Sequence, residues 1–154
     1  MFRALAVSVA FALSPAVFAA PDWVQISGTL DRTAYLDKSS VALSGDAITI
    51  EVLRSYDAPI NLGVDTETRT ELYPHSSAKV QYLVNCSARK VALNAWVLYG
   101  GNLGDGEIVW ADRQSGPVAF SAPADGEERY ALAAACAAKA AMQQSTRNVV
   151  EASQ

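Results

Sequence analysis

The sequence is poor in the residues that carry acid–base chemistry, with one histidine in 154 residues. A nucleophilic hydrolase needs a base that is held beside its nucleophile and oriented by a third group. The histidine, His75, lies in the segment Tyr73–Ser77, and a triad with a neighbouring serine and Asp57 or Asp65 can be drawn on paper. No motif supports that triad, so we expect His75 to be a solvated loop residue and the protein not to be an enzyme.

Patterns that bind metals or phosphates are also missing. Asp105 and Glu107 lack the dense oxygen-ligand spacing of a calcium loop. The four glycines between residues 100 and 106 do not follow a phosphate-binding spacing and are more simply hairpin residues. We therefore predict no metal site and no cofactor.

Basic residues are too few and too scattered to form a polyanion-binding surface. The chain has 12 Lys and Arg residues against 16 Asp and Glu residues, for a net charge of −4. Nucleic acids and anionic membranes are bound by clustered basic side chains. The composition therefore argues against both as main partners.

Long apolar runs are confined to the beginning of the chain. Arg3 precedes an apolar stretch from Ala4 to Leu13, and Val17 and Ala19 hold the small-residue positions of a cleavage site. This order predicts a signal peptide over residues 1–19. A retained membrane anchor is the alternative, but a bilayer requires about 20 apolar residues.

Cleavage after residue 19 would leave a domain with no transmembrane segment. Removal of residues 1–19 takes away one basic and no acidic residue, so the net charge becomes −5. No cysteine lies near the cleavage site, so no lipoprotein anchor is evident. We expect an exported protein, either periplasmic or secreted.

Cysteine is rare as well, with Cys86 and Cys136 as the only two. The bacterial periplasm oxidises thiols, so we predict that they form a disulfide; two buried free thiols are the alternative. A bridge closing this loop of about 50 residues would stabilise the fold by about 4 kcal/mol in the chain-entropy model.

Several segments alternate apolar and polar residues as β-strands do. They are residues 24–26 with 33–36, 47–56, 79–86, 90–99 and 107–113. Residues 57–77 contain two prolines, a glycine and several acidic residues, and we expect an irregular loop there, of the kind that tends to be functional or mobile. The strands predict an antiparallel sheet.

A helix is expected after the strands. Residues 121–128 carry the capping and acidic residues of a helix N-terminus, and residues 130–142 are mostly alanine. Leu132 and Cys136 share a helical face, so the disulfide would tie the helix to the strand that ends at Cys86. We predict one α+β domain over residues 20–142 and a polar, frayed tail over residues 143–154.

Aromatic and basic side chains are the remaining candidates for a binding surface. Tyr56, Tyr73 and Tyr99 border loops and are expected to be accessible. Arg89, Lys90 and Arg113 could form a small basic strip on the sheet, with an ordinary solvated face as the alternative. The three tryptophans are expected to pack in the core. They are Trp23, Trp96 and Trp110.

A series of short motifs runs in a recognisable order from residue 23 to residue 136. The motifs include Tyr35-Leu36-Asp37-Lys38-Ser39-Ser40-Val41, Ser44-Gly45-Asp46, Tyr56-Asp57-Ala58-Pro59, Asn85-Cys86, and Pro123 followed by a helix with Cys136. This order resembles the bacterial surface-adhesin E family. The resemblance implies a six-stranded antiparallel sheet with a C-terminal helix tied to it by a disulfide.

The resemblance also implies a binding module without catalytic activity. The founding members of the family look like adhesins that bind host matrix and serum proteins, so a protein partner is expected. A structural or assembly role in the cell envelope is the alternative, in which the chain forms a homodimer or larger homo-oligomer through an edge strand.

Overall fold

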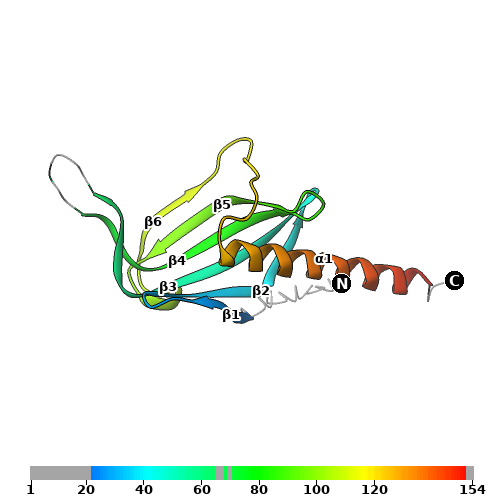
Figure 1. Ribbon diagram of the computed structural model, residues 1–154, viewed down its shortest axis with the longest axis horizontal. Helices are drawn as coiled ribbons and strands as arrows, with labels where there is room; N and C mark the ends of the chain where they lie inside the picture. Colours follow the sequence, from blue (N-terminus) through cyan, green and yellow to red (C-terminus); the bar gives the residue numbers. More distant parts are fainter. Residues whose placement is uncertain (1–21, 65–67, 69–70, 152–154) are drawn as a thin grey trace, which may run out of the picture.

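A computed structural model describes residues 22–64, 68 and 71–151, so the predicted signal peptide lies outside the described residues. The elements are β1 (Trp23–Gly28), β2 (Arg32–Ser44), β3 (Ala47–Val64), β4 (Glu71–Asn85), β5 (Lys90–Tyr99), the 3₁₀ turn η1 (Asn102–Gly104), β6 (Ile108–Arg113) and α1 (Gly126–Glu151). The six strands form one sheet, and α1 lies across one of its faces (Figure 1). This confirms the predicted α+β class.

The sheet is a meander in which every strand pairs with the next one along the chain. Its order is β1-β2-β3-β4-β5-β6, and all five pairings are antiparallel. Short connections suffice because antiparallel neighbours need only a hairpin turn. At the β2–β3 turn, Gly45 takes a φ of 59°, a backbone conformation that glycine adopts without steric cost.

The predicted irregular loop over residues 57–77 is mostly a β-hairpin, so that prediction was wrong. β3 continues to Val64 and β4 begins at Glu71, with Ile60 opposite His75. The pairing register shifts between Ser55 and Ile60, and the prolines and polar residues that suggested a loop are accommodated at and beyond this irregularity. The hairpin projects past the other strands as an arm (Figure 1).

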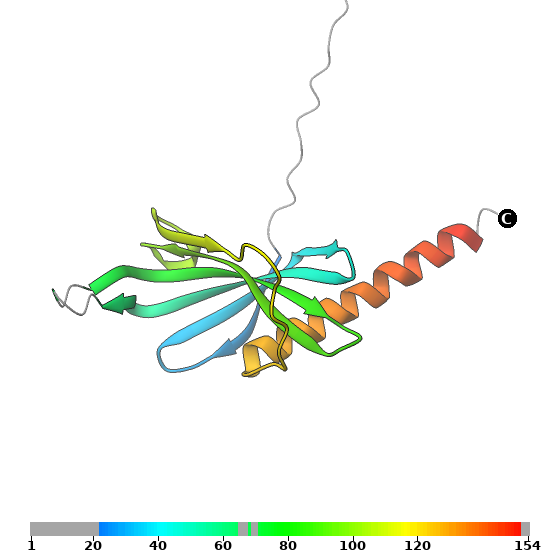
Figure 2. The ribbon, with the colours of Figure 1, turned by 90° about the horizontal axis from the view of Figure 1, so that it is seen from above.

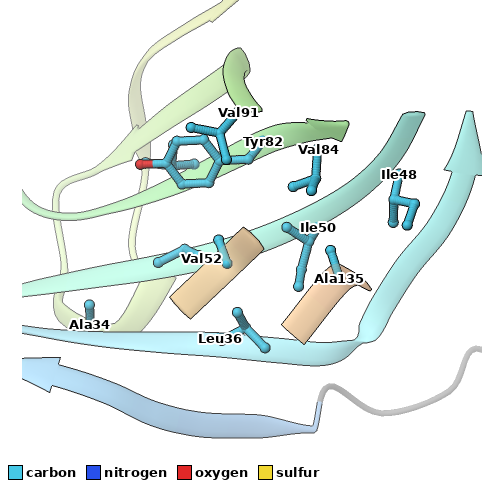
Figure 3. Packing of buried hydrophobic residues seen from close by; sticks show 11 residues of the cluster. Ala34, Leu36, Ile48, Ile50, Val52, Tyr82, Val84, Val91 and Ala135 are labelled. Carbon is cyan, nitrogen blue, oxygen red and sulfur yellow. The ribbon is translucent and has the colours of Figure 1, made fainter. Parts of the chain in front are cut away.

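The core lies between α1 and the face of the sheet that α1 covers. Alternate side chains of the central strands point into it, and Ala131 and Ala135 of α1 are fully buried against them (Figure 3). The strand residues of this cluster are Ala34, Leu36, Ile48, Ile50, Val52, Val80, Tyr82, Val84 and Val91. Because alanine is small, the helix backbone can approach the sheet closely.

The helix is longer than the sequence pattern suggested. We predicted an end at Met142 and a frayed tail, but α1 continues to Glu151 and leaves the tail prediction wrong for residues 143–151. Residues 141–149 are all exposed, and this half of α1 extends beyond the sheet (Figure 2). Within the described ranges, no helix combines the length and apolar character that crossing a membrane requires.

Reciprocal hydrogen bonds fix the beginning of α1. The Asp125 Oδ1 atom accepts from the Glu128 backbone N–H at 2.9 Å, and Glu128 Oε2 accepts from the Ala124 N–H at 2.6 Å. These bonds use N–H groups that have no partner inside the helix. The acidic residues predicted for this segment therefore act as caps.

The predicted disulfide is present between Cys86, directly after β4, and Cys136 in α1, with 5.6 Å between their Cα atoms. It ties the helix to the end of a central strand, as the sequence indicated. The bridge closes a separation of 50 residues.

A buried polar network forms a second tie between α1 and the sheet. The Arg54 guanidinium of β3 donates to both carboxylate oxygens of Glu127, with its Nη2 atom at 2.8 Å from Oε1. The Tyr82 hydroxyl accepts from Arg54 Nη2 at 2.8 Å and donates to Glu127 Oε1 at 2.9 Å. Glu127 is 1% exposed. Burial is the largest single influence on the pKa of Arg54 and lowers it, but the hydrogen bond to Glu127 and the charges of Tyr82, Glu127 and Tyr56 together raise the pKa above its ordinary value.

The network predicts a large loss of stability in the variant Glu127→Gln. The amide removes the negative charge that compensates Arg54, and an uncompensated buried charge costs about 3 kcal/mol or more. Urea unfolding monitored by circular dichroism should show this loss. The control Glu151→Gln changes the net charge equally at an exposed position of the same helix. Equal stability of the two variants would contradict the prediction.

Tyr82 predicts a loss of stability at alkaline pH. Burial, and then the charge of Glu127, raise the pKa of the Tyr82 phenol above its ordinary value of 10.0, although the charge of Arg54 opposes this. The unfolded chain therefore loses the Tyr82 proton near pH 10 while the folded chain keeps it, and the free energy of unfolding falls as the pH rises further. Urea titrations between pH 8 and 11 should show a smaller fall for Tyr82→Phe. Identical pH dependence in the two proteins would refute this assignment.

Candidate binding surface

Among the described residues, no α-helix lies on the face of the sheet opposite α1, and we call this the open face. Its side chains come from the alternate strand positions that do not enter the core. One row of cross-strand partners runs across it, from Tyr35 through Leu53 and Lys79 to Val97. The open face therefore combines aromatic, aliphatic and charged side chains.

The turn between β5 and β6 is folded back against this face. The Ser77 hydroxyl donates to the Gly101 carbonyl at 2.6 Å and accepts from the Gly104 N–H at 2.8 Å. Gly104 has a φ of 77°, and a Cβ atom there would lie 3.1 Å from Lys79 Cε. The positive φ explains why a glycine suits this position.

Leu103 is held in an unusual conformation by the same turn. Its φ is 56°, in the left-handed region that non-glycine residues rarely adopt, and its side chain is 58% exposed. Together with Trp23, Tyr35 and Leu53 it lines a pocket of about 220 Å³, the apolar pocket. Backbone strain of this kind is concentrated at functional positions.

A second depression, the polar groove, lies on the open face beside this pocket and also measures about 220 Å³. The two are adjacent because Leu53 of the pocket pairs with Lys79 of the groove. The groove is lined by Glu51, Lys79, Gln81, Ala95, Trp96, Val97, Tyr99 and Arg113. The Lys79 ammonium lies 5.6 Å from the centre of the Tyr99 ring, so the cation and the aromatic face are held together.

Of the six residues predicted for a binding surface, two lie on the open face. Tyr99 and Arg113 both line the polar groove. Tyr56 instead packs its ring against His75 at 5.5 Å. Tyr73 is 41% exposed and lies against Trp110 at 6.0 Å.

The basic strip suggested by the sequence is not formed. Lys90 pairs with Asn85 at the beginning of β5, whereas Arg113 pairs with Ala95, five residues or roughly 16 Å along the strand. Arg89 lies in the turn before β5 and lines a different pocket, beside the disulfide.

His75 is buried, which corrects the expectation of a solvated loop histidine. Its side chain is 3% exposed because the supposed loop is part of β4, and its Nδ1 atom lies 2.8 Å from the Tyr73 carbonyl oxygen. The hydroxyl of the nearby Ser77 is bonded to the η1 turn. Asp65, one of the two acidic residues considered for a triad with His75, lies outside the described residues. No group of three or more potential ligands for a metal ion occurs in the part of the chain that the structure describes.

The tryptophans divide between the two faces. Trp96 packs against the core cluster and touches the ring of Trp110 at 5.2 Å, but Trp23 lines the apolar pocket on the open face. The sequence could have indicated that Trp23 faces away from the core. Trp23 and Val24 are neighbours in a strand, so their side chains point to opposite faces of the sheet. For Leu103 the sequence contained only a weaker indication of an exposed apolar side chain, because it is an isolated large apolar residue in a glycine-rich turn.

The comparisons with known proteins identify the family. The family model of surface-adhesin protein E matches residues 23–137, which is most of the chain. The chain belongs to the surface-adhesin protein E family. No curated protein shows a significant sequence match.

Two solved structures share the fold at low sequence identity. Crystal form II of Haemophilus influenzae protein E is 12% identical, covers 82% of this chain and 97% of its own, and superimposes with a TM-score of 0.53. The selenomethionine form of Haemophilus influenzae protein E is 14% identical, covers 81% and 93%, and gives a TM-score of 0.54. The surface-adhesin E fold is therefore shared, while most of the side chains differ.

Proposed function

We propose that this protein is an exported, non-catalytic binding protein that engages a protein partner through the open face. One observation carries the proposal: Leu103, which is held at positive φ and is 58% exposed, lines the apolar pocket on the sheet face that α1 leaves uncovered. Membership of a surface-adhesin family supports the same role. The partner would be a host or envelope protein.

The chemistry of the open face favours a protein over a small molecule. Each depression holds about 220 Å³, which is below the usual range of small-molecule sites, about 300 to 1,000 Å³. Protein interfaces instead use exposed aromatic and aliphatic anchors with a polar rim. Trp23, Tyr35 and Leu103 supply such anchors, and Lys79 and Arg113 supply a rim that would suit an acidic region of the partner.

The location of the protein follows from the same proposal. Membership of the family implies an exported or surface protein. The disulfide fits an oxidising compartment, and the signal peptide expected from the sequence would deliver the chain there. Fractionation into periplasm, outer membrane and medium would distinguish a surface adhesin from a periplasmic protein.

The variant Leu103→Asn tests the proposal directly. Asparagine tolerates positive φ, so the fold is kept while the apolar anchor is removed. Binding of immobilised matrix proteins and envelope extracts, measured by biolayer interferometry, should weaken at least about tenfold if Leu103 is an anchor of the interface. The control is Leu43→Asn, at a leucine that is 61% exposed on β2. Equal binding of both variants, or no saturable partner for the unchanged protein, would reject the proposal.

The free edge of β6 supports a second candidate, assembly of the chain into a homo-oligomer. β6 is the last strand of the sheet, and its outer edge has no neighbouring strand in the described residues. Ile108 on this strand is 61% exposed. Edge strands of this kind pair readily with a second copy. Multi-angle light scattering should then show a dimer that Ile108→Lys converts to monomer, and a strict monomer at high concentration would exclude this candidate.

A further inference from the structure

A third pocket, away from the open face, lies where the disulfide joins α1 to the sheet. It measures about 410 Å³ and we call it the disulfide pocket. It is lined by Cys86, Arg89, Pro123, Arg129, Leu132, Ala133 and Cys136. Its wall is thus apolar apart from two arginines that come from different elements, and no acidic residue lines it.

Arg89 occupies a position where glycine would be the less strained choice. Its φ is 54°, in a turn closed by the Asn85 side chain, whose Oδ1 atom accepts from the Ala88 N–H at 2.9 Å. The bonds of the turn involve other residues and the Arg89 backbone, so they do not need the Arg89 side chain. The Arg89 side chain is therefore not required to hold the turn, and it is left to line the pocket.

Arg129 is also placed against a local preference. It is the fourth residue of α1, near the positive end of the helix dipole, where acidic side chains are favoured and cations are not. Two arginines that each break a local rule and line the same pocket point to a shared function.

The acidic groups nearby are committed to other partners. Glu127 binds Arg54, Glu128 caps the Ala124 N–H, and Asp125 caps the helix. Among the described residues, neither Arg89 nor Arg129 forms an ion pair. Both guanidinium groups are therefore available for an external anion.

We propose that the disulfide pocket binds the C-terminal carboxylate of a peptide whose last side chain is apolar. Guanidinium groups bind carboxylates through paired, charge-assisted hydrogen bonds. Leu132, Pro123 and the disulfide offer an apolar surface for the adjoining side chain. The volume of the pocket accommodates about one or two residues, so the site would recognise the end of a chain.

Calorimetric titration of the purified protein with acetyl-Gly-Leu tests this site, with acetyl-Gly-Leu amide and octanoate as comparison probes. The free acid should bind saturably and the amide at least about tenfold more weakly, because a charged hydrogen bond is lost. Equal binding of acid and amide, or no saturable binding of the acid, would overturn the proposal. Tighter binding of octanoate would also overturn it, in favour of an acyl carboxylate.

Three variants separate binding from folding. Arg89→Gly should weaken binding of the acid at least about tenfold while the melting temperature is kept or raised, because glycine relieves the strained φ. Arg129→Gln should weaken binding similarly. The control Arg147→Gln removes the same charge from the exposed part of α1 and should bind normally. If Arg89→Gly and Arg129→Gln bind as Arg147→Gln does, the pocket is not the site.

Discussion

The arrangement of the whole domain depends on the buried contact of Arg54 with Glu127 and Tyr82. A carboxylate that is 1% exposed is tolerated only with a charged partner and further hydrogen bonds, and this geometry is available in one placement of α1 on the sheet. The disulfide fixes the same helix again at Cys136, nine residues further along. Two attachments on one rigid helix determine both its position and its direction.

Because α1 is held on one face, the side chains of the opposite face do not have to pack against it. The strands keep their alternation on both sides, but only the covered side must be mostly apolar, with Arg54 and Tyr82 as polar members that are paired with Glu127. On the open face, strands β1 to β3 contribute Trp23, Tyr35 and Leu53 to the apolar pocket. The η1 turn, which is anchored by Ser77, adds Leu103. The proposed binding surface is thus built from strand positions that lie outside the core cluster under α1.

The sequence predicted the fold well where local patterns report directly on structure. Alternation identified the strands, and two cysteines in an exported chain identified the disulfide. The extent of the β3–β4 arm was missed, since Pro59 and Pro74 suggested a loop and the pairing of Ile60 with His75 is a long-range feature. The burial of His75 was missed for the same reason. The helix beyond Met142 was also missed, because its polar residues give no amphipathic pattern.

The residues of the proposed binding surface were anticipated less completely than the fold. Tyr99 and Arg113, both predicted as binding residues, line the polar groove of the open face, whereas Trp23 was assigned to the core and Leu103 was not singled out. That Trp23 and Leu103 line one pocket depends on how the η1 turn folds back onto the sheet, which no local pattern specifies. The partnership of Arg54 and Glu127, 73 residues apart, was likewise invisible to short-range reasoning.

The arm formed by β3 and β4 also determines how the domain would carry a mechanical load. The two strands that form the arm are the two central strands of the sheet. A pull on the arm draws both strands in the same direction, so their mutual hydrogen bonds bear little of it. The load passes instead as shear to the β2–β3 and β4–β5 pairings, where many inter-strand hydrogen bonds must break at the same time. The same meander that leaves a face open is therefore a stiff connection along the axis of its arm.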